Sequence, residues 1–139
     1  MKRIVTLIIT LVLLVPLNVL AQTYNVDPSH TTIQFKVKNM LIMNVKGVFE
    51  KFKGTVDIDE TDVTKSNVDV SIETASINTG IDRRDNDLRG PDFFDVVKFP
   101  TMRFVSTIVE AGKDNLKVTG NLTIKGVTKQ VVLIVSYSY

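Results

Sequence analysis

Ten consecutive residues carry the clearest structural signal in this sequence: Leu116-Lys117-Val118-Thr119-Gly120-Asn121-Leu122-Thr123-Ile124-Lys125. Apolar side chains stand at positions 116, 118, 122 and 124, and polar side chains stand between them. Successive side chains of a β-strand point to opposite faces of the sheet, so this alternation predicts a strand with one apolar and one hydrated face. Such strands are typical of antiparallel sheets that cover a single interior.

The same period of two recurs along most of the chain after residue 30. Apolar residues alternate with polar ones within 32–38, 54–59 and 68–73. Turn-forming residues separate these runs at 59–62, 111–115 and 125–126. This spacing predicts an antiparallel meander that closes into a barrel or a sandwich. The run Val131–Val135 is apolar at every position, which predicts a strand that is covered on its outer side as well.

One segment, Asn78–Asp95, departs from this rhythm and contains three arginines among five aspartates. Its apolar residues Ile81 and Leu88 are seven apart, which places them on one face of a helix. We therefore predict a short helix near Ile81–Arg89, with i,i+4 ion pairs Asp85–Arg89 and Arg83–Asp87. Gly90-Pro91 ends it, and a turn carrying Phe93 and Phe94 follows.

The N-terminus has the features of a secretory signal. Met1-Lys2-Arg3 is basic, and the apolar run Ile4–Leu20 leads to small or modest side chains at Val19-Leu20-Ala21. We predict that residues 1–21 are a cleaved signal peptide and that residues 22–139 form one domain, periplasmic or secreted. The alternative is that the segment stays attached as an N-terminal anchor.

Composition excludes several classes of function. The 139 residues include 17 Lys and Arg, 15 Asp and Glu, one His and no Cys. Without Lys2 and Arg3 the basic and acidic residues balance, so no excess of positive charge indicates nucleic-acid binding. The absence of cysteine excludes disulfides, thiol catalysis and Cys-based metal sites. A single histidine excludes His-cluster metal sites, and we predict no metal and no cofactor.

Several motifs together resemble one family. Asp27-Pro28-Ser29-His30-Thr31, followed by Ile33, Phe35 and Val37, resembles the opening strand of the YceI-like family of exported lipid-binding proteins. Further matching motifs are Gly47-Val48-Phe49, Gly54, Thr79-Gly80 through Arg84-Asp85, Leu88-Arg89, Asp92-Phe93-Phe94-Asp95, Phe99-Pro100 and Gly120 through Lys129. The resemblance extends over essentially all of residues 22–139.

The resemblance implies an extended lipocalin-like antiparallel β-barrel with a short helical insertion. Its elongated apolar cavity would hold a polyisoprenoid chain, such as a quinone tail or a polyprenyl phosphate, and the family is not known for catalysis. Members normally continue for some tens of residues beyond the hairpin at 120–129. This chain stops at Ser136-Tyr137-Ser138-Tyr139, so we expect a truncated member whose barrel is incomplete.

The candidate ligand-binding residues are the apolar side chains expected to face the interior. An ionic group among them would lose its hydration without compensation, so they predict a guest that is apolar along its length. The alternative is an ordinary packed core, which shows the same periodicity. Met40-Leu41-Ile42-Met43 either folds over the barrel mouth or continues a strand. The candidates are Ile33, Phe35, Val37, Val56, Val70, Ile72, Phe93, Phe94, Met102, Phe104, Val118 and Leu122.

Three polar residues are candidates for a head-group site or for a structural role. Arg84 or Arg89 could face the cavity entrance and bind a phosphate or a quinone head. Alternatively, the neighbouring aspartates pair with these arginines and fix the insertion to the barrel. His30 could contact Asp27, the insertion or a ligand head. A catalytic Ser29–His30 contact is not expected, because neighbouring residues of a strand point to opposite faces.

The sequence thus predicts a non-enzymatic protein that binds, transports or stores a long apolar isoprenoid lipid. Transient membrane contact and either a monomer or a dimer remain open. The alternative is a structural or stress-related interaction protein with a filled barrel, which binds a partner through its surface or through an unpaired edge strand at Val131–Val135.

Overall fold

The computed structural model of the chain describes residues 22–39 and 43–136, and it is built almost entirely of β-strands. One short α-helix, α1 (Asp82–Arg89), lies between strands β6 and β7, and two 3₁₀ turns, Val63–Lys65 and Thr74–Ser76, flank β5. The strands are β1 (Gln22–Asn25), β2 (Ile33–Asn39), β3 (Met43–Phe49), β4 (Phe52–Ile58), β5 (Asn67–Glu73), β6 (Ile77–Asn78), β7 (Thr101–Ala111), β8 (Asn115–Ile124) and β9 (Val127–Ser136).

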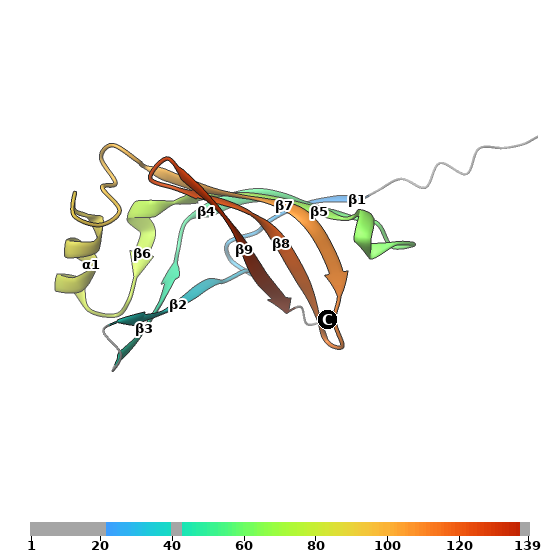
Figure 1. The fold of residues 1–139 in the computed structure, drawn as a ribbon, viewed down its shortest axis with the longest axis horizontal. Helices are drawn as coiled ribbons and strands as arrows, with labels where there is room; N and C mark the ends of the chain where they lie inside the picture. The colour runs from blue at the N-terminus through green and yellow to red at the C-terminus, as the bar shows by residue number, and fades with distance from the viewer. Residues whose placement is uncertain (1–21, 40–42, 137–139) are drawn as a thin grey trace, which may run out of the picture.

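These strands form two antiparallel sheets. The larger sheet has the order β1-β4-β5-β7-β8-β9, and the smaller has the order β2-β3-β6. Figure 1 shows the larger sheet curving over the interior, with α1 and the tip of the β8–β9 hairpin toward the same end of the molecule. The predicted all-β, lipocalin-like class is confirmed. The sheet is not closed into a barrel, because within the described residues β1 and β9 each pair on one side only.

Cross-strand pairing defines the inner face of the larger sheet. Val118 on β8 pairs with Val109 on β7 and with Leu133 on β9, and directly paired side chains lie on one face. Val109 and Val118 are almost fully buried, which marks this face as the interior. By the same register, the inner face of β9 carries Val127, Lys129, Val131, Leu133 and Val135.

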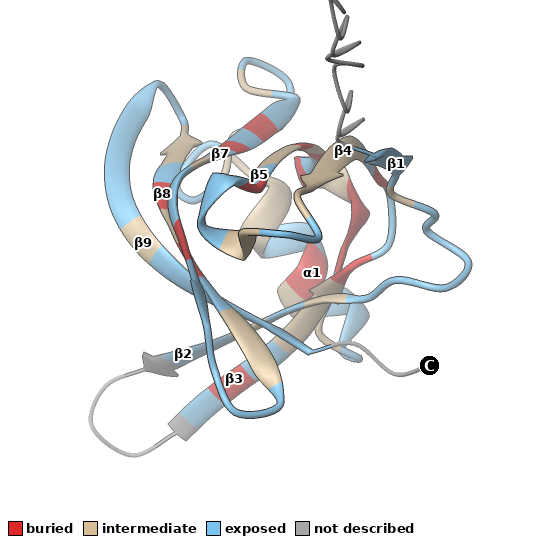
Figure 2. Ribbon diagram, turned by 90° about the vertical axis from the view of Figure 1, so that its right-hand side faces the viewer, coloured by how far each residue is buried: buried red, intermediate tan, exposed pale blue. Residues whose placement is uncertain are grey.

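The core consists of two clusters along this inner face. One joins the smaller sheet to β4, β5 and β7 around Phe49, Phe52, Val70, Ile72, Ile77 and Met102. The other lies beneath β7 and β8 around Phe104, Val109 and Val118. Strand β9 adds little to either, and in Figure 2 it is coloured almost entirely as exposed.

The prediction for the outer side of β9 is therefore wrong. Val132 and Ile134 point outward by register, and 49% and 61% of their respective surfaces are exposed. The sequence run is apolar on both faces as predicted, but no described segment covers the outer face.

Two local predictions are confirmed. The helix expected near Ile81–Arg89 is α1, and the backbone N–H of Gly90 donates to the carbonyl of Asp87 at its end. The turn at 125–126 joins β8 to β9 with φ of 52° at Lys125 and 76° at Gly126, the left-handed conformation that two-residue hairpins require. Neither predicted ion pair, Asp85–Arg89 or Arg83–Asp87, is found among the ion pairs of the described residues. Asp85 and Arg89 bond to other groups instead.

Candidate functional site

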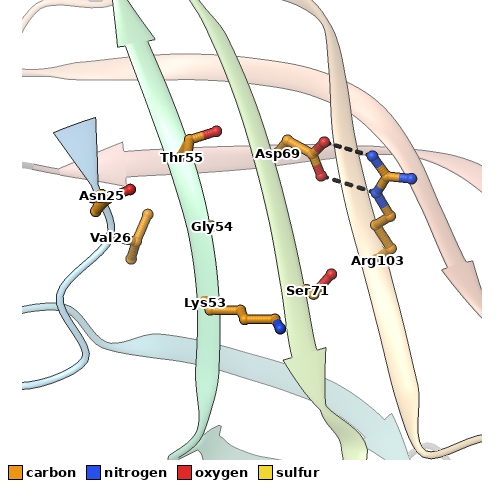
Figure 3. Close-up of a pocket in the computed structure, with 8 residues that line it drawn as sticks. All are labelled: Asn25, Val26, Lys53, Gly54, Thr55, Asp69, Ser71 and Arg103. Atoms are coloured by element: carbon orange, nitrogen blue, oxygen red, sulfur yellow. Dashed lines mark hydrogen bonds and ion pairs between the residues drawn. The ribbon is translucent and has the colours of Figure 1, made fainter. Parts of the chain in front are cut away.

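A hollow lies on each face of the larger sheet. The outer one measures about 550 Å³ and is lined mainly by polar and charged side chains of β1, β4, β5 and β7 (Figure 3). There Arg103 donates from Nε and Nη2 to the two carboxylate oxygens of Asp69, at 2.9 and 2.5 Å. These bonds lower the pKa of Asp69. A polar, exposed surface of this kind does not suit an apolar guest.

The inner hollow measures about 300 Å³ and is apolar apart from one residue. Leu122 and Ile124 of β8 form one side, and Val127, Lys129 and Val131 of β9 form the other. The pairs Leu122–Lys129 and Ile124–Val127 place these side chains on the inner face. Volumes of about 300–1,000 Å³ are typical of ligand pockets, so the hollow stands at the lower end of that range.

Most of the predicted ligand-binding residues lie in or against the packed core. Val70, Ile72, Met102, Phe104 and Val118 are buried. Half-buried residues surround them: Ile33, Phe35, Phe94 and Leu122 pack against the clusters, and Val56 lies on the inner face of β4.

Two of the predicted residues lie elsewhere. Val37 and Phe93 are 52% and 54% exposed. Of the twelve candidates, Leu122 alone lines the inner hollow. The roles of all twelve in ligand binding stay predictions.

Sequence reasoning did not single out the β9 side of the hollow. The signal was present, because Val127, Lys129 and Val131 stand two residues apart with polar residues between them, as on one face of a strand. What the pattern does not show is which face of the strand points inward. That depends on the register with β8, in which Gly120 pairs with Val131.

The two candidate arginines bond to residues that directly precede α1. Arg89 donates from Nε to the carbonyl of Ala75 at 2.8 Å and from Nη2 to that of Ile77 at 2.9 Å. Arg84 donates from Nε to the hydroxyl of Thr79 at 2.8 Å and from Nη2 to its carbonyl at 3.0 Å. Both side chains thus anchor α1 to the segment before it. These contacts fit the alternative in which the arginines fix the insertion in place. The acceptors are carbonyls and a hydroxyl, however, where aspartates were expected.

His30 lies in an exposed turn before β2, and the premise that Ser29 and His30 point to opposite faces of a strand is wrong. The Ser29 Oγ lies 2.9 Å from the His30 Nδ1, because residues 28–30 form a turn and not a strand. The same Nδ1 lies 2.7 Å from the Asp27 Oδ2. These bonds from His30 and Ser29 lower the pKa of Asp27 to about 2. A Ser-His-Asp relay needs its serine and aspartate on opposite ring nitrogens, and here both contact one.

The remaining features bear on metals and membranes. Within residues 22–39 and 43–136, no three His, Asp or Glu side chains gather as a metal site would require. The acidic turn after β4 is ordered by Asp59, which accepts hydrogen bonds from Thr61 and Asp62. No helix in the described ranges combines the length and apolar character needed to cross a membrane. Residues 1–21 and Met40–Ile42 lie outside the described residues, and Met43 begins β3.

Antiparallel strands curved over an apolar interior, with a helical insertion at one end, define an all-β, lipocalin-like protein. The chain belongs to the YceI-like domain family, whose model matches residues 24–138. It is 38% identical over 115 residues to Protein YceI of Salmonella newport and, equally, to that of Salmonella arizonae. The match covers 81% of this chain and 60% of either relative, so the chain spans about 60% of their length.

Solved structures show the same fold. Burkholderia cenocepacia BcnA superposes with a TM-score of 0.70 at 29% identity, over 82% of this chain and 72% of BcnA. A Campylobacter jejuni YceI protein superposes with a TM-score of 0.60 at 40% identity, over 80% of this chain and 66% of that protein.

Proposed function

We propose that this protein binds a long apolar lipid chain against the inner face of its larger sheet and serves as an exported carrier or store for it. One observation carries the proposal. The inner face continues past the packed core into an apolar hollow, where Val127 is 57% exposed, and farther along β9, where Leu133 is 39% exposed. Apolar side chains that face the interior and still contact water favour binding, because covering them with an apolar guest lowers the free energy.

The energetics favour a long chain over a compact ligand. Each methylene removed from water contributes about 0.8 kcal/mol, so a chain that lies along several residues of β8 and β9 accumulates affinity without polar contacts. The family resemblance favours an isoprenoid, either a quinone tail or a polyprenyl phosphate. Export rests on the basic start and apolar run of residues 1–21.

Native mass spectrometry of the full chain, expressed in a bacterial host and isolated from the periplasmic fraction, tests this proposal. We expect a protein that begins at Gln22 and carries a bound species of prenyl-lipid mass, which organic extraction removes. An empty monomer after gentle isolation would contradict lipid binding. A protein that retains residues 1–21 would contradict the cleaved signal.

A second candidate function rests on β9. Its outer face exposes Val132 and Ile134, and its outer backbone edge has no partner among the described strands. An exposed edge strand pairs readily with another strand, so the protein could act by binding a partner there. Lipid-free protein that forms defined dimers or complexes would favour this function over the carrier.

A further inference from the structure

The inner face of the larger sheet carries one charged residue within the described strands. The cross-strand register assigns 24 positions of β1, β4, β5, β7, β8 and β9 to this face, and they are apolar except for Gln22, Tyr24, Ser106 and Lys129. Gln22 and Tyr24 bond to each other, and the hydroxyl of Ser106 accepts from the backbone N–H of Val68. Lys129 is therefore the exception, and it lines the apolar hollow.

Several cations near this end of the fold bond to neighbouring groups, and Lys129 makes no such bond with the described residues. Lys125 donates to the carbonyl of Pro91 at 3.1 Å, and Arg84 and Arg89 bond to the segment before α1. On the outer face, the Lys117 Nζ lies 3.9 Å from the Glu110 Oε2. The ion pairs and hydrogen bonds of the described residues include none made by Lys129, whose side chain is exposed.

The surroundings of Lys129 define the chemistry that it can recognise. A lysine side chain packs its four-carbon stem against apolar neighbours and keeps its ammonium at the water boundary. Here Leu122 lies directly opposite, and Val127 and Val131 lie two residues away on the same face. An ammonium at the margin of an apolar groove pairs with a phosphate or a carboxylate, whose charge-assisted hydrogen bonds are stronger than neutral ones.

We propose that Lys129 is the head-group-selecting residue of an apolar groove, formed by the inner hollow and the inner face of β9, so that the preferred ligand is an amphiphile with a long apolar chain and an anionic head. The head lies at the β8–β9 hairpin end of the sheet, and the chain runs along β9 past Val131 toward Leu133 and Val135. This inference rests on the proposed lipid-binding function and adds the class of head group to it.

The experiment compares two probes that share one chain. The affinities of the full-chain product for a C15 isoprenoid monophosphate and for the corresponding alcohol are measured by calorimetry, with inorganic phosphate as a third probe. We expect the monophosphate to bind about tenfold more tightly than the alcohol, a difference of about 1.4 kcal/mol. Lys129→Gln is expected to remove this preference and to leave alcohol binding within about twofold.

Lys117→Gln is the matched control, because it removes the same charge from the outer face of the neighbouring strand. It is expected to change neither affinity. Circular dichroism and thermal melting confirm that each variant is folded. Lys129→Arg, which keeps the charge, is expected to retain the preference for the monophosphate.

The other outcomes contradict specific parts of the account. If Lys129→Gln leaves the preference intact, Lys129 serves only as an inward charge that protects an edge strand from pairing, and the head-group inference is wrong. The inference is also wrong if inorganic phosphate binds as tightly as the monophosphate and displaces it without displacing the alcohol. The site would then recognise free phosphate. If neither amphiphile binds, the proposed lipid function fails together with it.

Discussion

At the scale of single residues, short-range hydrogen bonds account for several polar side chains that looked functional. Asp27, Ser29 and His30 bond to one another in a turn that precedes β2. Asp85 is buried and accepts from the backbone N–H and the hydroxyl of Thr79. A buried carboxylate needs such partners, because its desolvation is otherwise costly. These polar groups stabilise the ends of elements, and none of them lines the inner hollow.

The turn at residues 27–30 is expected to respond to acid. Hydrogen bonds from His30 and Ser29 favour the ionised carboxylate and hold the Asp27 pKa at about 2, against an ordinary value of 3.8. A lowered pKa means that this stabilisation is complete above about pH 4 and is lost as the pH falls through 2. Carboxyl titration by NMR measures it directly. In His30→Ala the Asp27 midpoint should move up toward 3.8, and an unchanged midpoint would contradict the assigned cause.

At the scale of elements, α1 is held to the sheet by arginine bonds to main-chain carbonyls. Arg89 contacts Ala75 and Ile77 on the segment that leads from β5 into β6, and Asn86 within the helix. Leu88 packs against the core from the same helix. These bonds and Leu88 thus fix α1 against β6 of the smaller sheet and the core.

Removal of the Arg89 side chain is expected to destabilise the protein without changing lipid selectivity. Arg89→Ala leaves two carbonyls without their donor, which costs about 1–3 kcal/mol in a chemical-unfolding measurement. Arg83→Ala is the control on the same helix, since Arg83 is exposed and makes no hydrogen bond or ion pair with the described residues. If Arg89→Ala instead weakened binding of the isoprenoid monophosphate selectively at unchanged stability, the head group would lie at α1.

Strand β9 bears on both proposed functions, self-association through its outer face and lipid binding through its inner face. Its outer residues Val132 and Ile134 are exposed, whereas Val131 on the inner face is half-buried. We expect Ile134→Lys to reduce self-association in sedimentation velocity and to leave lipid binding unchanged, because it adds a charge to the outer face only. Loss of bound lipid in this folded variant would show that the ligand reaches the outer face.

Much of this element structure follows from periodicity, and the parts that do not follow have physical causes. Alternation predicted the strands around Phe35, Val56, Val70 and Leu122, and the spacing of Ile81 and Leu88 predicted α1. The contact between Ser29 and His30 depended on a turn that alternation does not encode. The acceptors of Arg89 are main-chain atoms, which no sequence pattern specifies. The place of Lys129 depended on strand register.

At the scale of the whole molecule, the fold separates a packed core from an apolar groove along one curved sheet. The core fills the interior beneath β4, β5, β7 and β8, where Phe104 and Met102 are almost fully buried. Toward β9 the same inner face stays in contact with water. Most of the predicted ligand-binding residues are therefore side chains of the packed core, and the groove begins where the core ends at Leu122.

The most direct test of the account is methyl NMR of the protein with a bound C15 isoprenoid alcohol, in which intermolecular NOEs report only protons in direct contact. Val131 and Val132 are adjacent on β9 but face opposite sides of the sheet, so each serves as the control for the other. We predict NOEs from the isoprenoid chain to the methyl groups of Val127, Val131 and Leu133 and none to those of Val132 and Ile134. NOEs to Val132 and Ile134, with none to Val131, would contradict binding at the inner face.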